Sequence, residues 1–144
     1  MQLSYRFRIY PSRAQEEKLL AALELCRWLY NRLLEELNRA RTEDGKITRL
    51  QTQALIVKLK DEKPELKIVY SKVLQMVNYQ LWGNIRGLAV LKRNGRRVGR
   101  LRYKGEWFKT LNFNQSGFNL EDCKLVLSKV GKIPIKLHRE VRGK

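Results

Sequence analysis

The chain begins with a regular alternation of apolar and polar side chains. Over residues 2–10 every second residue is apolar, and a period of two places such residues on one face of an extended segment. Aromatic and β-branched residues in this pattern favour a half-buried strand, which Pro11 would end. We therefore predict the first strand over residues 2–10. Its apolar face consists of Leu3, Tyr5, Phe7 and Ile9.

After Pro11 the apolar spacing changes to alternating steps of four and three, which is the spacing of one helix face. Ser12 and Gln15 have the pattern of a capping box, in which each side chain accepts a hydrogen bond from the other residue's backbone N–H. We predict a long core-forming helix that starts there and ends near residues 44–45. Its apolar stripe consists of Leu19, Leu23, Cys26, Tyr30, Leu33 and Leu37.

Two further helices are predicted between residues 48 and 92. Thr48 repeats the capping-box pattern with a glutamine three residues later, and this helix should stop before Pro64. Ser71 is expected to cap the next helix. Gly83 and Gly87 lie inside it, where each costs about 1 kcal/mol relative to alanine. Glycines four apart permit another backbone to come close, and we interpret them as a helix-packing site, with a nucleic-acid backbone as the alternative.

From about residue 100 the pattern changes to short apolar runs separated by turn-forming residues, as in an antiparallel meander or small barrel. The simplest closure pairs these runs with the first strand. The expected strands are 101–103, 107–113, 124–127 and 133–137.

These elements predict an α+β fold. We expect a small antiparallel β-barrel of the OB-like kind, with a three-helix lobe inserted after its first strand. The first strand would occupy residues 1–11 and the helical lobe residues 12–92. A basic loop and the remaining barrel strands would occupy residues 93–144.

The composition indicates what kind of molecule the protein binds. The 144 residues contain 31 Lys and Arg against 14 Asp and Glu, a net charge of +17. Residues 12–45 are nearly neutral, with six basic and seven acidic side chains, whereas residues 92–105 have seven basic side chains and no acidic one. Such an excess favours an acidic polymer, nucleic acid before an anionic membrane surface.

The apolar runs are too short for membrane insertion. No run approaches the 18 apolar residues of a membrane span, and the N-terminus alternates where a signal peptide would be apolar. We expect a cytoplasmic protein that associates with the nucleoid when bound, with no membrane partner.

Catalytic and metal-binding patterns are not found in the sequence. Cys26, Cys123 and His138 do not supply the four ligands of a usual zinc site. Most carboxylates of the first helix have basic neighbours three or four residues away, as in solvated ion pairs. Metal-dependent phosphodiester chemistry needs carboxylates that converge from separate rigid elements, and no predicted strand interior contains one. We expect no enzymatic activity, no cofactor and no metal.

Five motifs, in order along the chain, resemble the TnpB (OrfB) proteins of insertion sequences. The departures are Tyr70 and Leu101, where that family usually has proline, and Gly83 with Gly87, which interrupt its usual aromatic-rich helix end. The motifs are Y-R-F-R-I-Y-P-S-x-x-Q at 5–15, C-R-W-L-Y-N at 26–31, S-K-V-L-Q at 71–75, G-R-L-R-Y-K at 99–104 and G-K-I-P-I-K at 131–136.

The resemblance implies a fold and an activity. Members of that family are transposon-encoded RNA-guided DNA endonucleases, similar to type V CRISPR effectors. Their wedge β-barrel and helical recognition lobe hold guide RNA and read a short motif beside the target in duplex DNA. Their RuvC-like nuclease domain and zinc ribbon follow the wedge domain, so the resemblance implies a truncated module that ends at Lys144 before both. We expect it to bind nucleic acid without cleavage, and leave open whether the truncation is natural.

The resemblance also assigns residues to two kinds of contact. Of the DNA-facing residues, Gln75 is of the type that pairs bidentately with adenine in the major groove. Tyr103, Trp107 and Phe108 stack on bases or belong to the barrel core. The residues assigned to duplex DNA are Arg49, Thr52, Ser71, Lys72 and Gln75, with Asn112 and Asn114 from the wedge side. Those assigned to backbone phosphates of RNA or heteroduplex are Arg93, Arg96, Arg97, Arg100, Arg102 and Lys104.

Two alternatives remain open. The chain could be a sequence-nonspecific RNA-binding protein that uses the barrel and the basic loop. It could instead be a partner-binding module of a transposase complex. The wide apolar surface of the first helix permits a homo-oligomer, although no motif indicates one.

Overall fold

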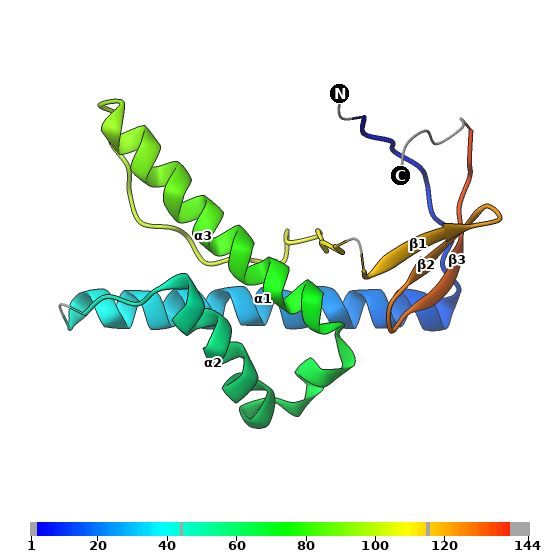
Figure 1. The fold of residues 1–144 in the computed structure, drawn as a ribbon, viewed down its shortest axis with the longest axis horizontal. Coiled ribbons are helices and arrows are strands. Elements are labelled where there is room, and N and C mark those ends of the chain that lie inside the picture. The colour runs from blue at the N-terminus through cyan, green and yellow to red at the C-terminus, as the bar shows by residue number, and fades with distance from the viewer. Residues whose placement is uncertain (1–2, 44, 115, 139–144) are drawn as a thin grey trace.

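The computed structural model describes residues 3–43, 45–114 and 116–138, and combines helices with one small sheet (Figure 1). The long helix α1 is flanked by α2 on one side, and α3 crosses it and extends away on the other (Figure 1). The sheet lies near the N-terminal end of α1. The helices are α1 (Arg13–Thr42), α2 (Arg49–Glu62), the 3-10 helix η1 (Pro64–Ile68) and α3 (Ser71–Arg93), and the strands are β1 (Phe118–Glu121), β2 (Lys124–Leu127) and β3 (Gly131–Pro134).

Both predicted capping boxes are confirmed. At the start of α1 the Ser12 N–H donates to Gln15 Oε1 (2.9 Å), and the Gln15 N–H donates to Ser12 Oγ (3.3 Å). The same reciprocal pair joins Thr48 and Gln51 at the start of α2, at 2.8 and 3.3 Å. These bonds satisfy backbone donors that the first helical turn leaves without partners. The two helix starts therefore follow from local sequence.

The predicted cap of the third helix is wrong. Ser71 is the first residue of α3 itself, and the preceding residue, Tyr70, makes no side-chain capping bond. The Ser71 hydroxyl instead accepts a hydrogen bond from Lys60 Nζ (3.2 Å), which links the last turns of α2 to the first turn of α3.

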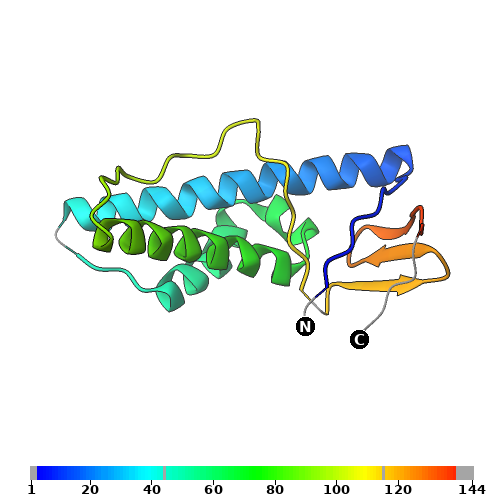
Figure 2. The same cartoon turned by 90° about the horizontal axis from the view of Figure 1, so that it is seen from above.

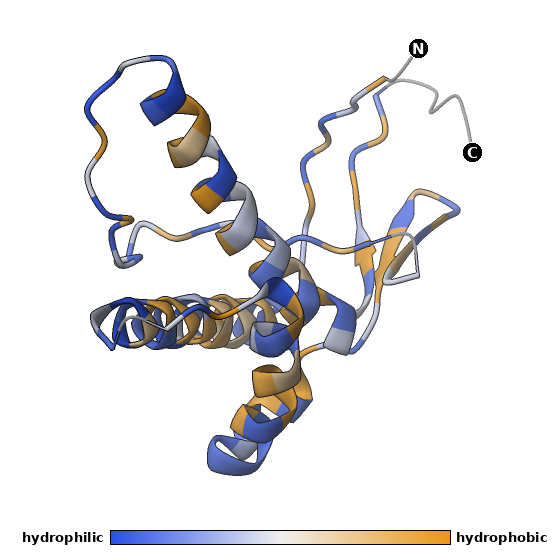
Figure 3. Cartoon of the chain, turned by 60° about the vertical axis from the view of Figure 1, so that its left-hand side comes forward, coloured by the Kyte–Doolittle hydropathy of each residue, from blue (hydrophilic) through white to orange (hydrophobic). Residues whose placement is uncertain are grey.

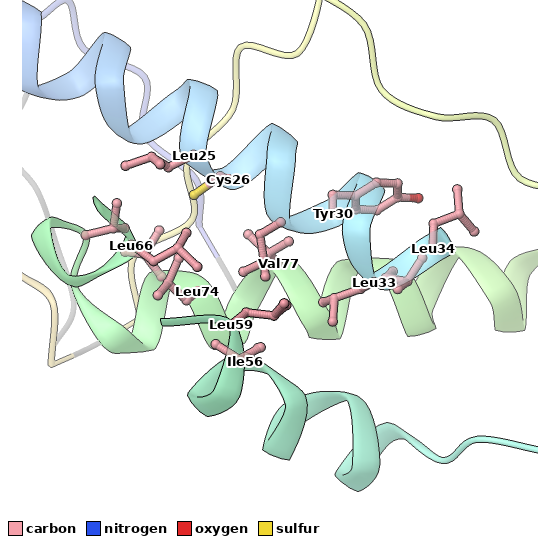
Figure 4. Packing of buried hydrophobic residues seen from close by; sticks show 14 of the residues in the cluster. Leu25, Cys26, Tyr30, Leu33, Leu34, Ile56, Leu59, Leu66, Leu74 and Val77 are labelled. Atoms are coloured by element: carbon pink, nitrogen blue, oxygen red, sulfur yellow. The ribbon is translucent and has the colours of Figure 1, made fainter. Parts of the chain in front are cut away.

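The hydrophobic core lies between α1, α2, η1 and the N-terminal half of α3 (Figure 4). Of the apolar stripe predicted for α1, the four members from Cys26 to Leu37 are buried in this core, whereas Leu19 and Leu23 are only half-buried outside it. Leu59 of α2, Leu66 of η1 and Leu74 of α3 pack into the same cluster. Because each helix buries one face there, the cluster determines how the three helices are oriented.

The two cysteines differ in reactivity. Burial in this core raises the pKa of the Cys26 thiol to about 12, whereas Cys123 is exposed at the β1–β2 turn. Because the thiolate is the reactive form, we expect a thiol reagent at pH 8 to label one thiol per folded chain, at Cys123. A second should be labelled only in denaturant. Mass spectrometry of the labelled peptides measures this; labelling of Cys26 in the folded protein would contradict its burial.

The strands form an antiparallel meander of order β1-β2-β3. Phe118 is opposite Leu127, and Leu125 is opposite Ile133. The N-terminal segment joins this sheet through a single bridge between Ile9 and Ile135.

The two flanking backbone hydrogen bonds run from the Tyr10 N–H to the Pro134 carbonyl (2.8 Å) and from the Lys136 N–H to the Arg8 carbonyl (3.0 Å). The predicted pairing of the N-terminus with the C-terminal strands is thus confirmed at residues 8–10, but the strand predicted over 2–10 is wrong for residues 3–8, which form no strand. Gln2, the first residue of the predicted strand, lies outside the described residues.

The α+β class is confirmed, but the described residues form an open three-stranded sheet and no closed barrel. The segments 101–103 and 107–113, predicted as strands, do not pair with any described strand. Their apolar side chains pack against the helical core, so the segment follows the helices instead of a sheet (Figure 2). The residues concerned are Leu101, Phe108, Leu111 and Phe113.

The predicted helix-packing site on α3 is also wrong. A Cβ built at Gly83 or Gly87 meets nothing within 4 Å. Both glycines therefore lie against open space. The C-terminal half of α3 separates from the other helices, as Figure 1 shows.

Candidate nucleic-acid interface

One candidate surface is a groove between α2 and the first turns of α3. Leu50, Gln53, Ala54 and Val57 recur on α2 at the spacing of one helix face, opposite the face that α2 buries in the core. Leu50 and Val57 are 69% and 66% exposed. Together with Lys60, Ser71 and Gln75 they line a groove of about 310 Å³. The α2–α3 groove thus combines apolar side chains with amides.

Gln75 is half-buried in the α2–α3 groove, and its side chain has no hydrogen-bond partner among the described residues. Gln53 lines the same groove from α2. It too is half-buried, and its side chain has no hydrogen-bond partner among the described residues. An unpaired carboxamide offers both a donor and an acceptor to a ligand. Gln53 was not predicted from the sequence. The signal that could have found it is the second apolar face of α2, since a helix with two such faces can bury only one in a small core.

Thr52, predicted to face DNA, is fully buried. Trp82 Nε1 donates to its hydroxyl oxygen (2.9 Å), and that oxygen lies 2.7 Å from Asn78 Oδ1. Asn78 Nδ2 in turn donates to the Arg49 carbonyl (3.2 Å). The prediction for Thr52 is therefore wrong, because its hydroxyl satisfies buried polar groups that join α2 to α3.

Of the other three side chains predicted to face DNA from α2 and α3, two make contacts within the chain and one is exposed. The Arg49 guanidinium lies over the Tyr79 ring, 4.7 Å from its centroid, in a cation–π contact between α2 and α3. The Ser71 hydroxyl is held by Lys60. Lys72 is exposed on the first turn of α3.

The two asparagines lie beyond α3 and hydrogen-bond within the chain. Asn112 Nδ2 donates to Gln80 Oε1 on α3 (3.2 Å). Asn114 Oδ1 accepts from the Ser116 hydroxyl (2.8 Å), which also lies 2.9 Å from the Tyr70 hydroxyl. Both asparagines lie between α3 and β1, outside the sheet, so the prediction that a wedge barrel positions them is wrong.

The basic loop, residues 93–104, is a second candidate surface. Five of its six predicted phosphate-binding side chains are exposed and have no hydrogen-bond, ion-pair or ring partner among the described residues. No described carboxylate is paired with them, so they are available to an external anion. These side chains are Arg93, Arg96, Arg97, Arg100 and Arg102.

Lys104 differs from these arginines. Its Nζ lies 5.1 Å from the centroid of the Tyr30 ring and 4.9 Å from that of Trp107, and its backbone exchanges two hydrogen bonds with the Asn31 side chain. Burial raises the pKa of the Tyr30 hydroxyl, which accepts a bond from Asn84 Nδ2 (2.9 Å). Lys104 is therefore an anchor for the loop on α1, and the prediction of a free phosphate contact is corrected.

The predicted base-stacking aromatics have different surroundings. Phe108 is half-buried against the helical core, whereas the alternative to base stacking had placed it in a barrel core. Trp107 is exposed and covers Lys104. Tyr103 is exposed, and its hydroxyl accepts from Asn38 Nδ2 at 3.3 Å.

A cleft of about 910 Å³ lies between the C-terminal halves of α1 and α3 and the start of the basic loop. Five apolar side chains form what we call its floor, and six cationic residues line its rim. No Asp or Glu is among its lining residues in the described part of the chain. The floor consists of Leu34, Leu37, Trp82, Ile85 and Leu88, and the rim of Arg41, Lys46, Lys92, Arg96, Arg97 and Arg100.

Four of the five carboxylates of α1 are paired with arginines along the helix, as their spacing predicted. Arg32 contacts Glu36 and Arg27 contacts Glu24, each at 2.8 Å. The hydrogen bond from Arg27 lowers the pKa of Glu24. Within the described ranges no three His, Cys, Asp or Glu side chains gather as a metal site would require.

Of the helices that the structure describes, none is both long and apolar enough to cross a membrane.

Clustered exposed cations without partners are typical of nucleic-acid-binding proteins. Comparison with known proteins narrows this class. Residues 1–46 match the helix-turn-helix domain of the OrfB proteins of IS605 elements. The match covers about a third of the chain and shows that this N-terminal region is similar to that of the OrfB proteins of IS605 elements. No curated protein matches the chain.

The matched residues contain only the first helix of the lobe. Among the described residues of 1–46, the structure has one continuous helix, α1, and α2 begins at Arg49. The helices that build the α2–α3 groove thus follow the matched region.

Proposed function

We propose that the protein binds duplex DNA in a sequence-dependent manner without cleaving it. The α2–α3 groove would contact base edges, and the arginines of the basic loop would contact backbone phosphates. The observation that carries the proposal is the pair of unpaired amides, Gln53 and Gln75, that line one groove, in a chain that also has a separate segment of unpaired arginines.

The chemistry of the α2–α3 groove suits the major groove of DNA. A glutamine amide can accept from adenine N6 and donate to N7, which distinguishes adenine from the other bases. Exposed apolar side chains beside it, such as Leu50 and Val57, suit the thymine methyl group. Lys72, exposed on the first turn of α3, would contact an adjacent phosphate and carry no sequence information.

The resemblance to RNA-guided nucleases extends this proposal to RNA. Arginine side chains bind the phosphates of RNA and DNA alike, so the basic loop would also hold a structured guide RNA. Competition between a structured RNA and the DNA duplex for the protein measures the relative affinities. The absence of strand cleavage in Mg²⁺ is part of the same proposal and is measured by incubating labelled duplex with the protein.

Gln75→Ala tests the base contacts. Selection from a random duplex library should first enrich a sequence that contains adenine. The substitution should then weaken binding of the enriched duplex by about 1–3 kcal/mol, the value of a bidentate base contact. It should leave the affinity for unselected duplex unchanged. Fluorescence anisotropy at fixed salt measures both affinities.

Gln80→Ala is the matched control, because Gln80 is the same residue type on the same helix but does not line the α2–α3 groove. It should leave the sequence preference intact. If Gln75→Ala weakened every duplex equally, Gln75 would have no role in base recognition. If the wild type enriched no sequence at all, the sequence-dependent part of the proposal would be wrong.

A further inference from the structure

We infer that the cleft between α1 and α3 binds unpaired nucleotides, with bases against its apolar floor and phosphates along its basic rim. This inference rests on the proposed nucleic-acid-binding function and adds a second site to it, specific for single strands. Its volume of about 910 Å³ lies within the roughly 300–1,000 Å³ of sites that enclose small ligands.

The first observation is that the floor is apolar and partly open. Leu88 and Ile85 of α3 and Trp82 are only half-buried, and they face the cleft in the part of α3 that separates from α1. In Figure 3 the hydrophobic bands of this half of α3 lie beside the hydrophilic segment that follows it. Phosphate contacts alone would not require such a floor, because a phosphate binds to cations and N–H donors.

The second observation concerns Trp82. Its indole N–H is donated to the buried Thr52 hydroxyl, which is itself held by Asn78. The indole is thus oriented by groups on α2 and α3, while its side chain lines the cleft. A fixed aromatic ring is the usual platform for an unpaired base. Thr52 would be a positioning residue for this platform.

The third observation is the sign of the surrounding charge. Cations come from all three walls of the cleft, with Arg41 on α1, Lys92 on α3 and Arg97 on the loop, and no carboxylate opposes them among the described residues. The occupant is therefore polyanionic and carries flat apolar groups between its charges. A single-stranded nucleic acid has this repeat, whereas paired bases in a duplex are stacked inside and cannot reach the floor.

Oligonucleotides with and without bases test the inference on the wild-type chain. We expect (dT)₁₂ to bind about 10-fold or more tightly than an abasic 12-mer with the same phosphates, since stacking of even one base supplies a factor of this size. Trp82→Leu should reduce binding of (dT)₁₂ to the abasic level and leave duplex binding unchanged. Phe118→Leu, which removes an exposed aromatic ring on β1 outside the cleft, should change neither affinity.

Fluorescence provides a second measurement that leaves Trp82 in place. In a chain with Trp28 and Trp107 replaced by phenylalanine, Trp82 is the remaining tryptophan, and (dT)₁₂ should quench it while the abasic strand does not.

If the protein bound (dT)₁₂ and the abasic 12-mer with equal affinity and still bound duplex DNA, the cleft site would be overturned. The proposed function would then remain supported. Failure to bind any of the nucleic acids would overturn both. Quenching by a Glu-rich amphipathic peptide in place of (dT)₁₂ would also overturn the inference and identify a protein partner.

Discussion

Replacement of the five exposed arginines of the basic loop by glutamine is expected to weaken duplex binding by about 5,000-fold at 0.15 M salt. Each phosphate contact releases about 0.9 of a counterion, which contributes about 1 kcal/mol at this salt concentration. Five contacts therefore contribute about 5 kcal/mol. The plot of log K against log salt should become shallower by about 4.5. The residues replaced are Arg93, Arg96, Arg97, Arg100 and Arg102.

A second variant with the same net charge separates local contacts from overall attraction. It replaces five exposed cations that lie outside the loop, and it should lose less than about tenfold in affinity because only long-range steering changes. If both variants lost affinity equally, the surplus positive charge would attract DNA only through its total amount, and the basic loop would make no specific phosphate contacts. The control positions are Arg13, Lys18, Lys109, Lys124 and Lys136.

Truncation of Leu74 to alanine is expected to destabilise the protein by about 2–5 kcal/mol. Leu74 is fully buried where α3 meets η1 and α2, so the substitution removes apolar contacts and leaves a cavity that the packed helices fill only in part (Figure 4). Because small domains have about 5–15 kcal/mol of stability in total, this is a large fraction of it. Urea unfolding followed by helical circular dichroism measures the change.

Leu50→Ala is the matched control for this substitution. The same three carbon atoms are lost from a side chain that is 69% exposed, so the cost should be within about 0.5 kcal/mol. Leu50 lines the α2–α3 groove, and its loss should appear in DNA binding instead of stability. A Leu74→Ala loss below 1 kcal/mol would contradict the core as described.

The helix starts could be predicted because their determinants are local. Ser12 with Gln15, and Thr48 with Gln51, need only three residues of separation to form their reciprocal bonds. The apolar stripe of α1 likewise depends only on helical spacing. For the same reason β2 was predicted with its observed bounds, since its apolar run lies between two tight turns.

The barrel prediction failed where partners distant in sequence decide the outcome. An apolar run such as 107–113 has the composition of a strand, but Phe108, Leu111 and Phe113 pack against the helical core. β1, in contrast, was missed because its side chains are exposed and its pairing with β2 comes from the turn at Asp122 and Cys123, both with positive φ. Alternation alone does not say which neighbour a segment will meet.

The candidate site shows the same division. The resemblance predicted a DNA contact for Gln75, and the charge density of the sequence predicted the arginine-rich loop as a phosphate-binding segment, because amide chemistry and charge are properties of the residues themselves. Only the tertiary structure decided that Thr52 is buried under Trp82 and that Lys104 is enclosed by two rings. It also brought Arg41, Lys92 and Arg97 around one apolar cleft. The sequence by itself determined the charges, the helix caps and the helical segments. The packing of α1, α2 and α3 determined which charged and polar side chains remain free to bind a ligand, because burial depends on contacts between segments far apart in the chain.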